Sequence, residues 1–358
     1  MDNTITSVIP VKGSSVCFPN KQAGRQTWID VGKGIAMLCV VYGHVVETFY
    51  RSQLLQGSDI TLILLEIVKS FYMPLFIMLS GVSFATAYVY TDNRKVILDK
   101  NRINRQCLNL GILYIMHSVV YWGIKYSFLN NNVHFRVSVR DLLMIPVKSI
   151  QLFWYLYVLI CLYLFMKCIA YISARKIVLL IGFMMSMISF SWSCYADYTV
   201  LRCFFYFSFF YLGFFLIMEK KIIILKKVTF IISQLLIFIV FLYVGWGGVA
   251  VIGVIRTILG ITVSLAVLGV SQLFCKCSIL QYIGRHSLEI YLLHVYFTSG
   301  SRVLIYKRLI ANVHMSMVAA AILGVICPLI CSAILQKIPR TWNTLFKPIA
   351  IRLHKPIA

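Results

Sequence analysis

Four ionisable side chains recur on one face of the first apolar segment of the chain. Asp30, Lys33, His44 and Glu47 lie within an otherwise mostly apolar stretch, and Lys33 and His44 are 11 residues apart. In a helix this is about three turns, so both side chains point the same way, roughly 16 Å apart along the axis. Asp30 lies one turn before Lys33, and Glu47 one turn after His44. A charge within a membrane span costs at least about 2.5–3.5 kcal/mol, so such residues usually face a cavity and mark a function.

His44 has the chemistry of a general base. A neighbouring carboxylate, here Glu47, can hold an imidazole in one tautomer and stabilise its protonated form. Two other interpretations stay open. Asp30 and Lys33 can mark the cytoplasmic interface, with the lysine reaching back to the headgroups. His44 can be a neutral histidine that forms a hydrogen bond between helices.

A second group of charges follows in a basic segment. Arg102 and Arg105 are three residues apart, directly before a later apolar run. At the start of a helix they share one face, where two guanidinium groups can bind phosphates at the cytoplasmic surface. The alternative is that they are ordinary positive charges of a cytoplasmic loop.

The composition requires that these residues sit on membrane helices. Of the 358 residues 60% are hydrophobic and 13% are charged, with a mean hydropathy of +0.86. Soluble domains have about half apolar and a quarter charged residues. Runs of about 18 apolar residues indicate spanning helices, and open strands are excluded because lipid offers no partner for their backbone groups. We therefore predict an all-α, polytopic integral membrane protein with about ten transmembrane helices. The predicted spans are about 30–49, 66–88, 107–128, 151–171, 177–194, 200–218, 228–246, 249–273, 279–299 and 312–335.

The net charge of +23 follows the membrane topology and does not indicate nucleic-acid binding. Lysine and arginine cluster in short gaps between apolar runs, as in cytoplasmic loops. Placing residues 94–105 in the cytoplasm puts both termini there too. Arg302, Lys307 and Arg308 then fall outside, against the rule. We expect a polar cytoplasmic segment at 1–27 without a cleavable signal peptide, a membrane domain at 28–336 and a basic cytoplasmic tail at 337–358.

Five segments in order resemble a known family. They are Ile29-Asp30-Val-Gly-Lys33-Gly-Ile-Ala with Gly43-His44; Phe71-x-Met-Pro-Leu-Phe with Leu79-Ser-Gly81; Arg102-x-x-Arg105; Leu152-Phe-Trp154-Tyr-Leu156; and Ile283-Gly284-Arg-His-Ser287-Leu-Glu-Ile-Tyr291-Leu-Leu-His294. Together they resemble acyltransferase family 3, the membrane-bound acyltransferases that include many O-acetyltransferases of bacterial polysaccharides.

The resemblance implies an activity and a place in the cell. It implies transfer of an acyl group, commonly acetyl from cytoplasmic acetyl-CoA, to a hydroxyl of an envelope polysaccharide or glycolipid. The protein is then a multi-pass protein of the bacterial inner (plasma) membrane. His44 matches the position taken as catalytic, Lys33 the basic residue before it, and Arg102 and Arg105 the paired arginines associated with the donor.

The sequence departs from the family pattern at two positions. Tyr72 stands where many relatives have histidine, and tyrosine does not act as a base near neutral pH. Lys33 stands where many relatives have arginine, and a lysine cannot donate the two parallel hydrogen bonds that a guanidinium group gives to a phosphate. Trp154 and His294 are weaker candidates for the substrate path. Trp154 can equally belong to an interfacial aromatic belt, and His294 can simply form a bond across helices.

Our leading hypothesis makes His44 the base, oriented by Glu47, with Lys33, Arg102 and Arg105 at the acetyl-CoA. An acyl-histidine intermediate is an open alternative. Other open possibilities are a transporter or flippase for an envelope glycan or lipid-linked intermediate, and transfer of another acyl group such as succinyl. We expect no metal site. The sequence leaves the acceptor, the membrane face of transfer and the oligomeric state undetermined.

Overall fold

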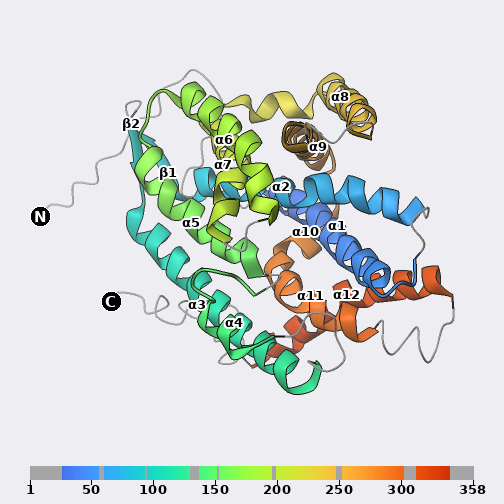
Figure 1. The fold of residues 1–358 in the computed structure, drawn as a ribbon. Helices are drawn as coiled ribbons and strands as arrows, with labels where there is room; N and C mark the ends of the chain where they lie inside the picture. Colours follow the sequence, from blue (N-terminus) through green and yellow to red (C-terminus); the bar gives the residue numbers. More distant parts are fainter. Residues whose placement is uncertain are drawn as a thin grey trace, which may run out of the picture.

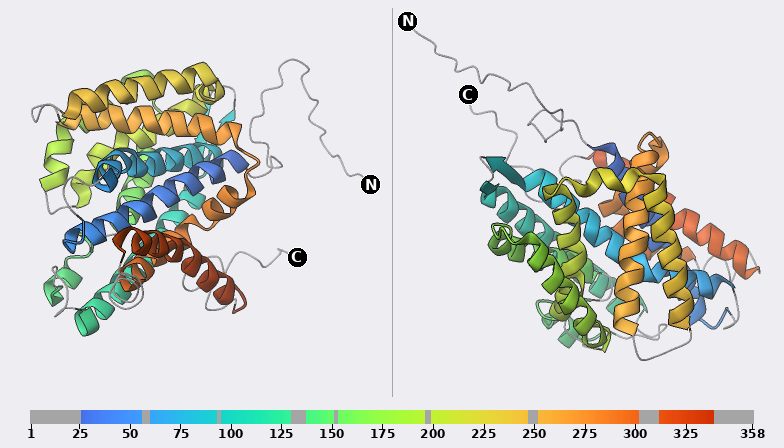
Figure 2. Two further views of the ribbon diagram at one scale, coloured as in Figure 1. Left: turned by 90° about the vertical axis from the view of Figure 1, so that its right-hand side faces the viewer. Right: turned by 90° about the horizontal axis from the view of Figure 1, so that it is seen from above.

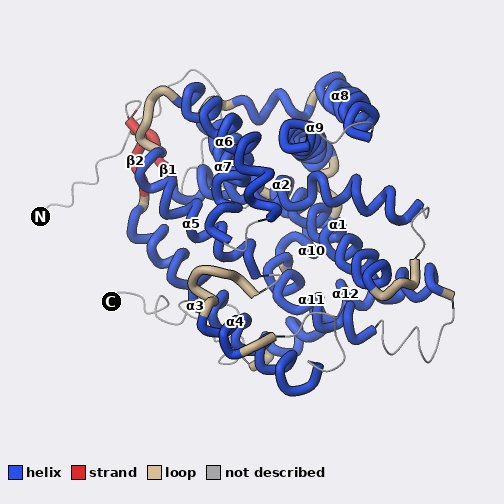
Figure 3. The backbone as a smooth tube through the Cα atoms, viewed as in Figure 1, coloured by secondary structure: helices blue, strands red, loops and turns tan. Residues whose placement is uncertain are grey.

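The structure is a computed structural model that describes residues 26–55, 60–92, 95–129, 137–150, 153–195, 199–246, 252–301 and 312–338. These residues form a bundle that is almost entirely helical (Figures 1 and 3). Within them the strands are limited to one antiparallel hairpin, β1 (Val89–Asp92) and β2 (Lys95–Leu98). The predicted all-α class is therefore confirmed for the bundle, and the hairpin is an addition in the basic segment.

The helices follow the predicted spans closely. They are α1 (Thr27–Arg51), α2 (Ile60–Tyr88), α3 (Lys100–Ile124), α4 (Val139–Leu143), α5 (Trp154–Ile169), α6 (Arg175–Tyr195), α7 (Thr199–Met218), α8 (Val228–Trp246), α9 (Ile252–Leu273), α10 (Ser278–Arg285), α11 (Ser287–Ser301) and α12 (Val313–Gln336). A π-helical turn, Lys125–Leu129, extends α3, and a 3₁₀ turn, Lys221–Lys226, precedes α8.

Six helices in the described residues are long and apolar enough to cross a membrane. They lie at Thr27–Arg51, Leu64–Tyr88, Lys100–Ser127, Thr199–Met218, Val254–Leu273 and Val313–Gln336. For the other four predicted spans, at α5, α6, α8 and α10 with α11, membrane crossing stays a prediction. The protein is thus a multi-pass membrane protein by the length and composition of its helices.

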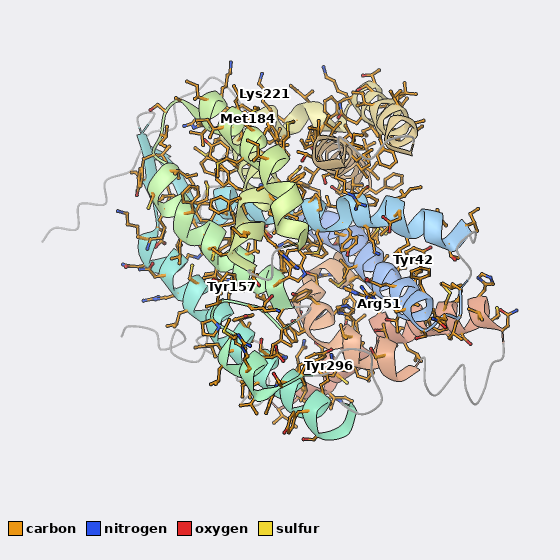
Figure 4. The ribbon with its side chains drawn as sticks, viewed as in Figure 1. Tyr42, Arg51, Tyr157, Met184, Lys221 and Tyr296 are labelled. Atoms are coloured by element: carbon orange, nitrogen blue, oxygen red, sulfur yellow. The ribbon has the colours of Figure 1, made fainter. Side chains whose placement is uncertain are left out.

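Peripheral helices present apolar side chains outward. On α12 the exposed residues Ile322, Ile326, Ile330 and Ile334 recur every four positions and form one stripe. Met184 on α6 is also exposed (Figure 4). In water such a stripe would be costly, whereas in a bilayer it faces hydrocarbon chains.

Two polar contacts connect helix ends that lie on the same side of the membrane if successive spans alternate in direction. At one end of the bundle Lys167 Nζ donates to Asn104 Oδ1 at 2.6 Å, and Arg175 pairs with Glu219 at 2.6 Å. The helices of these two pairs, α3 with α5 and α6 with α7, therefore run antiparallel. Which end faces the cytoplasm stays a prediction.

Helix α1 is the centre of the bundle and contacts α2, α9, α10, α11 and α12 (Figure 2). Glycines allow its closest contact. A Cβ on Gly34 would overlap the carbonyl of Leu280 in α10, and a Cβ on Gly284 would overlap the carbonyl of Asp30. Gly34 and Gly284 therefore permit α1 and α10 to approach backbone against backbone.

The ninth predicted span differs from the structure. Instead of one helix over 279–299, α10 and α11 meet at His286, whose φ of −100° and ψ of 17° interrupt the helix. Hydropathy did not reveal the interruption because apolar residues continue on both sides. The conflicting charges Arg302, Lys307 and Arg308, and most of the predicted terminal segments, lie outside the described residues.

Candidate active site

A cavity of about 170 Å³ lies beside α1, at the level of Lys33. Its walls come from α1, α2, α3, α5 and α11. The residues of the lining with polar groups are Lys33, Ser80, Ser83, Gln106, Tyr155, Tyr163, Ser287 and Tyr291, and the remainder is apolar, as in most small-molecule sites. Lys33 therefore lines an internal space together with groups from four other helices.

Two histidines stand one turn beyond this cavity. Val40 lines it on α1, and His44 follows four residues later; Tyr291 lines it on α11, and His294 follows three residues later. The rings of His44 and His294 have centroids 5.2 Å apart and planes at 41°. His294 is fully buried, whereas His44 is only partly buried. The structure thus brings together two predicted site residues that are 250 positions apart in the chain.

A chain of side chains connects the cavity wall to this pair. Tyr155 and Ser80 share a hydrogen bond at 2.9 Å between their hydroxyl oxygens. The ring centroids of Tyr155 and Tyr291 are 5.4 Å apart, and the ring centroids of Tyr291 and His294 are 6.3 Å apart. None of Tyr155, Ser80 and Tyr291 was predicted as a site residue, although all three lie inside the matched segments.

Glu47 binds another partner. Its carboxylate Oε1 accepts hydrogen bonds from Nε of Arg51 at 3.0 Å and from Nη2 at 2.6 Å. Arg51 ends α1 (Figure 4). Spacings of three and four residues both bring side chains together on a helix, so the sequence could not decide between His44 and Arg51 as partners of Glu47. The predicted role of Glu47 beside His44 stays a prediction.

The two arginines of the basic segment lie in the first turns of α3, and both are exposed. Arg102 donates from Nη1 to the carbonyl of Ala87 at 3.0 Å and lies over the Tyr88 ring at 5.4 Å. The Asp99 side chain caps α3 by accepting from the backbone N–H of Arg102. Gln106, which directly follows Arg105, lines the cavity. The arginine pair therefore lies on the helix that supplies Gln106 to the cavity wall.

The remaining candidates, Tyr72 on α2 and Trp154 on α5, directly precede the cavity-lining residues Met73 and Tyr155. The Tyr72 ring packs against Gly43, next to His44, where an added Cβ would be 3.6 Å away. Trp154 stacks on Tyr206 at 5.2 Å, and the guanidinium of Arg202 lies 4.9 Å from the Trp154 ring centroid. Sequence reasoning missed Arg202, because an arginine at the start of an apolar run has no distinctive spacing.

Charges gather near Tyr72. It lies within electrostatic reach of Glu47, Glu66 and Arg202. Glu66 in turn pairs with Arg256 of α9 at 3.2 Å and with Lys69 at 3.6 Å. The site thus has Lys33 and its cavity on one side of the histidines, and Tyr72 with this mixed group of charges on the other.

Comparison with known proteins identifies the family. The family model of acyltransferase family 3, described as an acyltransferase domain, matches residues 26–336. The match runs from the residue before α1 to the last residue of α12. No curated protein and no solved structure matches the chain. A match over this share of the sequence confirms the resemblance: the chain belongs to acyltransferase family 3.

Proposed function

We propose that the protein transfers an acetyl group from acetyl-CoA to a hydroxyl of an envelope polysaccharide or glycolipid, with His44 as the general base. Membership of the family gives the acyltransferase activity, and the donor, the acceptor and the base are our proposals. These proposals rest on the cavity at Lys33. Helices α1 and α11, which carry His44 and His294, both line this cavity about one turn before their histidines.

The cavity suits the acyl donor in shape and chemistry. The pantetheine arm of coenzyme A is narrow and carries amide groups. The apolar walls, together with the hydroxyls of Ser80, Ser83 and Ser287, match such a chain. Lys33 supplies a positive charge for the phosphates or for the developing oxyanion, and Arg102 and Arg105 add charge on α3.

The reaction places one proton at His44. His44 takes the proton of the acceptor hydroxyl as that oxygen attacks the thioester carbonyl. The carbon–sulfur bond then breaks, and the coenzyme A thiolate receives the proton from His44. The products are the acetyl ester and free coenzyme A, and His44 is again neutral.

The acceptor would approach from the side of Tyr72. Trp154 is the first residue of α5, and Arg202 and Tyr206 lie in the first half of α7. Tyr72 is within electrostatic reach of Arg202 and Glu66, and Glu66 pairs with Lys69 and Arg256. Aromatic rings and charged groups are the usual partners of sugar rings and their substituents. We therefore propose that Tyr72, Trp154 and Arg202 border the acceptor path.

The test uses purified protein in liposomes with acetyl-CoA and glycan-bearing membranes from the cells that make it. We expect coenzyme A release and one added acetyl group per modified sugar by mass spectrometry. His44→Ala should lower the rate by about 10²–10⁴-fold. The matched control is His314→Ala, because His314 is exposed at the start of α12. Near-normal transfer by His44→Ala would disprove the assignment of the base.

Donor binding separates this proposal from transport and from other acyl groups. Calorimetry should detect acetyl-CoA binding that weakens in Lys33→Ala and in the double variant Arg102→Ala/Arg105→Ala. A glycan transporter would not bind acetyl-CoA, and a succinyltransferase would bind succinyl-CoA more tightly than acetyl-CoA.

A further inference from the structure

We propose that His294 is a positioning residue that accepts a hydrogen bond from His44, fixes its tautomer and shares its proton during transfer. The inference rests on the proposed function of His44. It assigns to a second histidine the part that spacing in the sequence suggested for Glu47.

The surroundings of His294 define its own tautomer. Its Nδ1 lies 2.9 Å from the carbonyl oxygens of both Ile290 and Tyr291. Carbonyl oxygens only accept hydrogen bonds, so Nδ1 must carry the proton. Nε2 of the neutral ring then has a free lone pair and can act only as an acceptor.

Among the residues that the structure describes, no donor forms a hydrogen bond to this lone pair. Nε2 of His294 is buried without a hydrogen-bond partner there. A buried acceptor without a partner is destabilising, and such groups in native proteins usually serve a ligand, an ion or a catalytic step. The neighbouring polar ring is His44, at a centroid distance of 5.2 Å. This separation allows one nitrogen of each ring to face the other at hydrogen-bond distance after rotation of the His44 side chain.

The carboxylate that would otherwise orient His44 is held elsewhere. Glu47 receives two hydrogen bonds from Arg51. Lys69, the charged group with electrostatic reach to His44, is a cation and cannot accept a hydrogen bond. His294 is therefore the acceptor best placed to hold the N–H of His44.

The consequence for the reaction is a defined proton path. With one His44 nitrogen donating to His294, the other nitrogen has its lone pair directed at the acceptor hydroxyl. When the hydroxyl proton arrives, the positive charge is shared through the His44–His294 hydrogen bond. The same proton leaves His44 for the coenzyme A thiolate, so His294 ends the cycle unchanged.

The first test compares two substitutions of His294 that differ in hydrogen bonding. His294→Leu keeps bulk without an acceptor, whereas His294→Gln offers an amide oxygen to His44. We expect kcat to fall about 10²-fold or more in His294→Leu with an unchanged KM for acetyl-CoA, and to recover by at least tenfold in His294→Gln. His314→Ala is the control. Equal losses in both variants, or near-normal kcat in His294→Leu, would overturn the proposal.

The second test needs no activity and separates failure of this inference from failure of the proposed function. The chain has seven histidines, and ¹⁵N-histidine spectra of the protein in bilayers, with His44→Gln for assignment, report the tautomer of His44. We expect a single tautomer in the natural protein and a mixture in His294→Leu. An identical His44 signal in both proteins would overturn the role of His294, whether or not the protein transfers acetyl groups.

Discussion

At the scale of single residues, Arg102 and Arg105 share one sequence pattern but differ in their surroundings. Arg102 ties the start of α3 to the end of α2 through the Ala87 carbonyl and the Tyr88 ring. Arg105 is exposed one turn later. The pattern left both arginines open to phosphate binding or to a role as ordinary loop charges, whereas the contacts give Arg102 a structural role.

We therefore predict different effects of removing the two side chains. Arg102→Ala should lose a hydrogen bond and a cation–π contact, worth together about 1–2 kcal/mol of stability, and should also weaken donor binding. Arg105→Ala should weaken donor binding with unchanged stability. Thermal unfolding in detergent and acetyl-CoA titration measure the two effects. Equal unfolding temperatures for the two variants would contradict the structural role of Arg102.

At the scale of helices, α1 and α10 pack backbone against backbone through Gly34 and Gly284. Gly284→Ala places a methyl group against the Asp30 carbonyl, where only main-chain atoms could yield. We expect a loss of about 1–3 kcal/mol and a lower unfolding temperature. The matched control is Gly111→Ala in α3, where an added Cβ meets nothing within 4 Å. That variant should be neutral or gain up to about 1 kcal/mol from helix propensity. Similar behaviour of both variants would contradict the close packing.

The stability of the short helix α4, which lies outside the predicted spans, should depend on pH. Asp141 forms a capping box with Ser138, and the hydrogen bond from the Ser138 backbone holds the pKa of this carboxyl below its ordinary range. A depressed pKa means that the cap is present above the ordinary pKa of aspartate and is lost as the pH falls through the lowered value. The protection of the 138–144 amides against hydrogen exchange, measured relative to the intrinsic exchange rate at each pH, should therefore fall in acid. In Asp141→Asn this protection should not change with the titration, and equal pH dependence of the protection in both proteins would rule out the cap.

At the scale of the whole molecule, the predicted orientation is open to direct measurement. In a cysteine-free background, Ser173→Cys should react with an impermeant maleimide only after cells are permeabilised. Lys148→Cys, at the opposite helix ends, should react in intact cells. The reason is the excess of lysine and arginine in the loops predicted to be cytoplasmic. Labelling of Ser173→Cys in intact cells would reverse the topology.

The sequence predicted the positions of the helices well, because the lipid restricts spanning segments to apolar helices. It selected Lys33 and His44 as candidate site residues because ionisable groups are rare in such apolar segments. It could not pair His44 with His294, since contacts between α1 and α11 depend on long-range packing. It also could not choose between His44 and Arg51 for Glu47, because both spacings are geometrically permitted.

The interruption at His286 has a mechanical consequence. α10 is locked to α1 by the two glycines, whereas His294 is carried by α11 beyond the interruption. The joint at His286, together with the packing of α11 on α1 and α12, therefore sets the gap between the two imidazoles. Ser287 and Tyr291 of α11 also line the cavity at Lys33, so a change at this joint would alter the cavity and the distance between the imidazoles together.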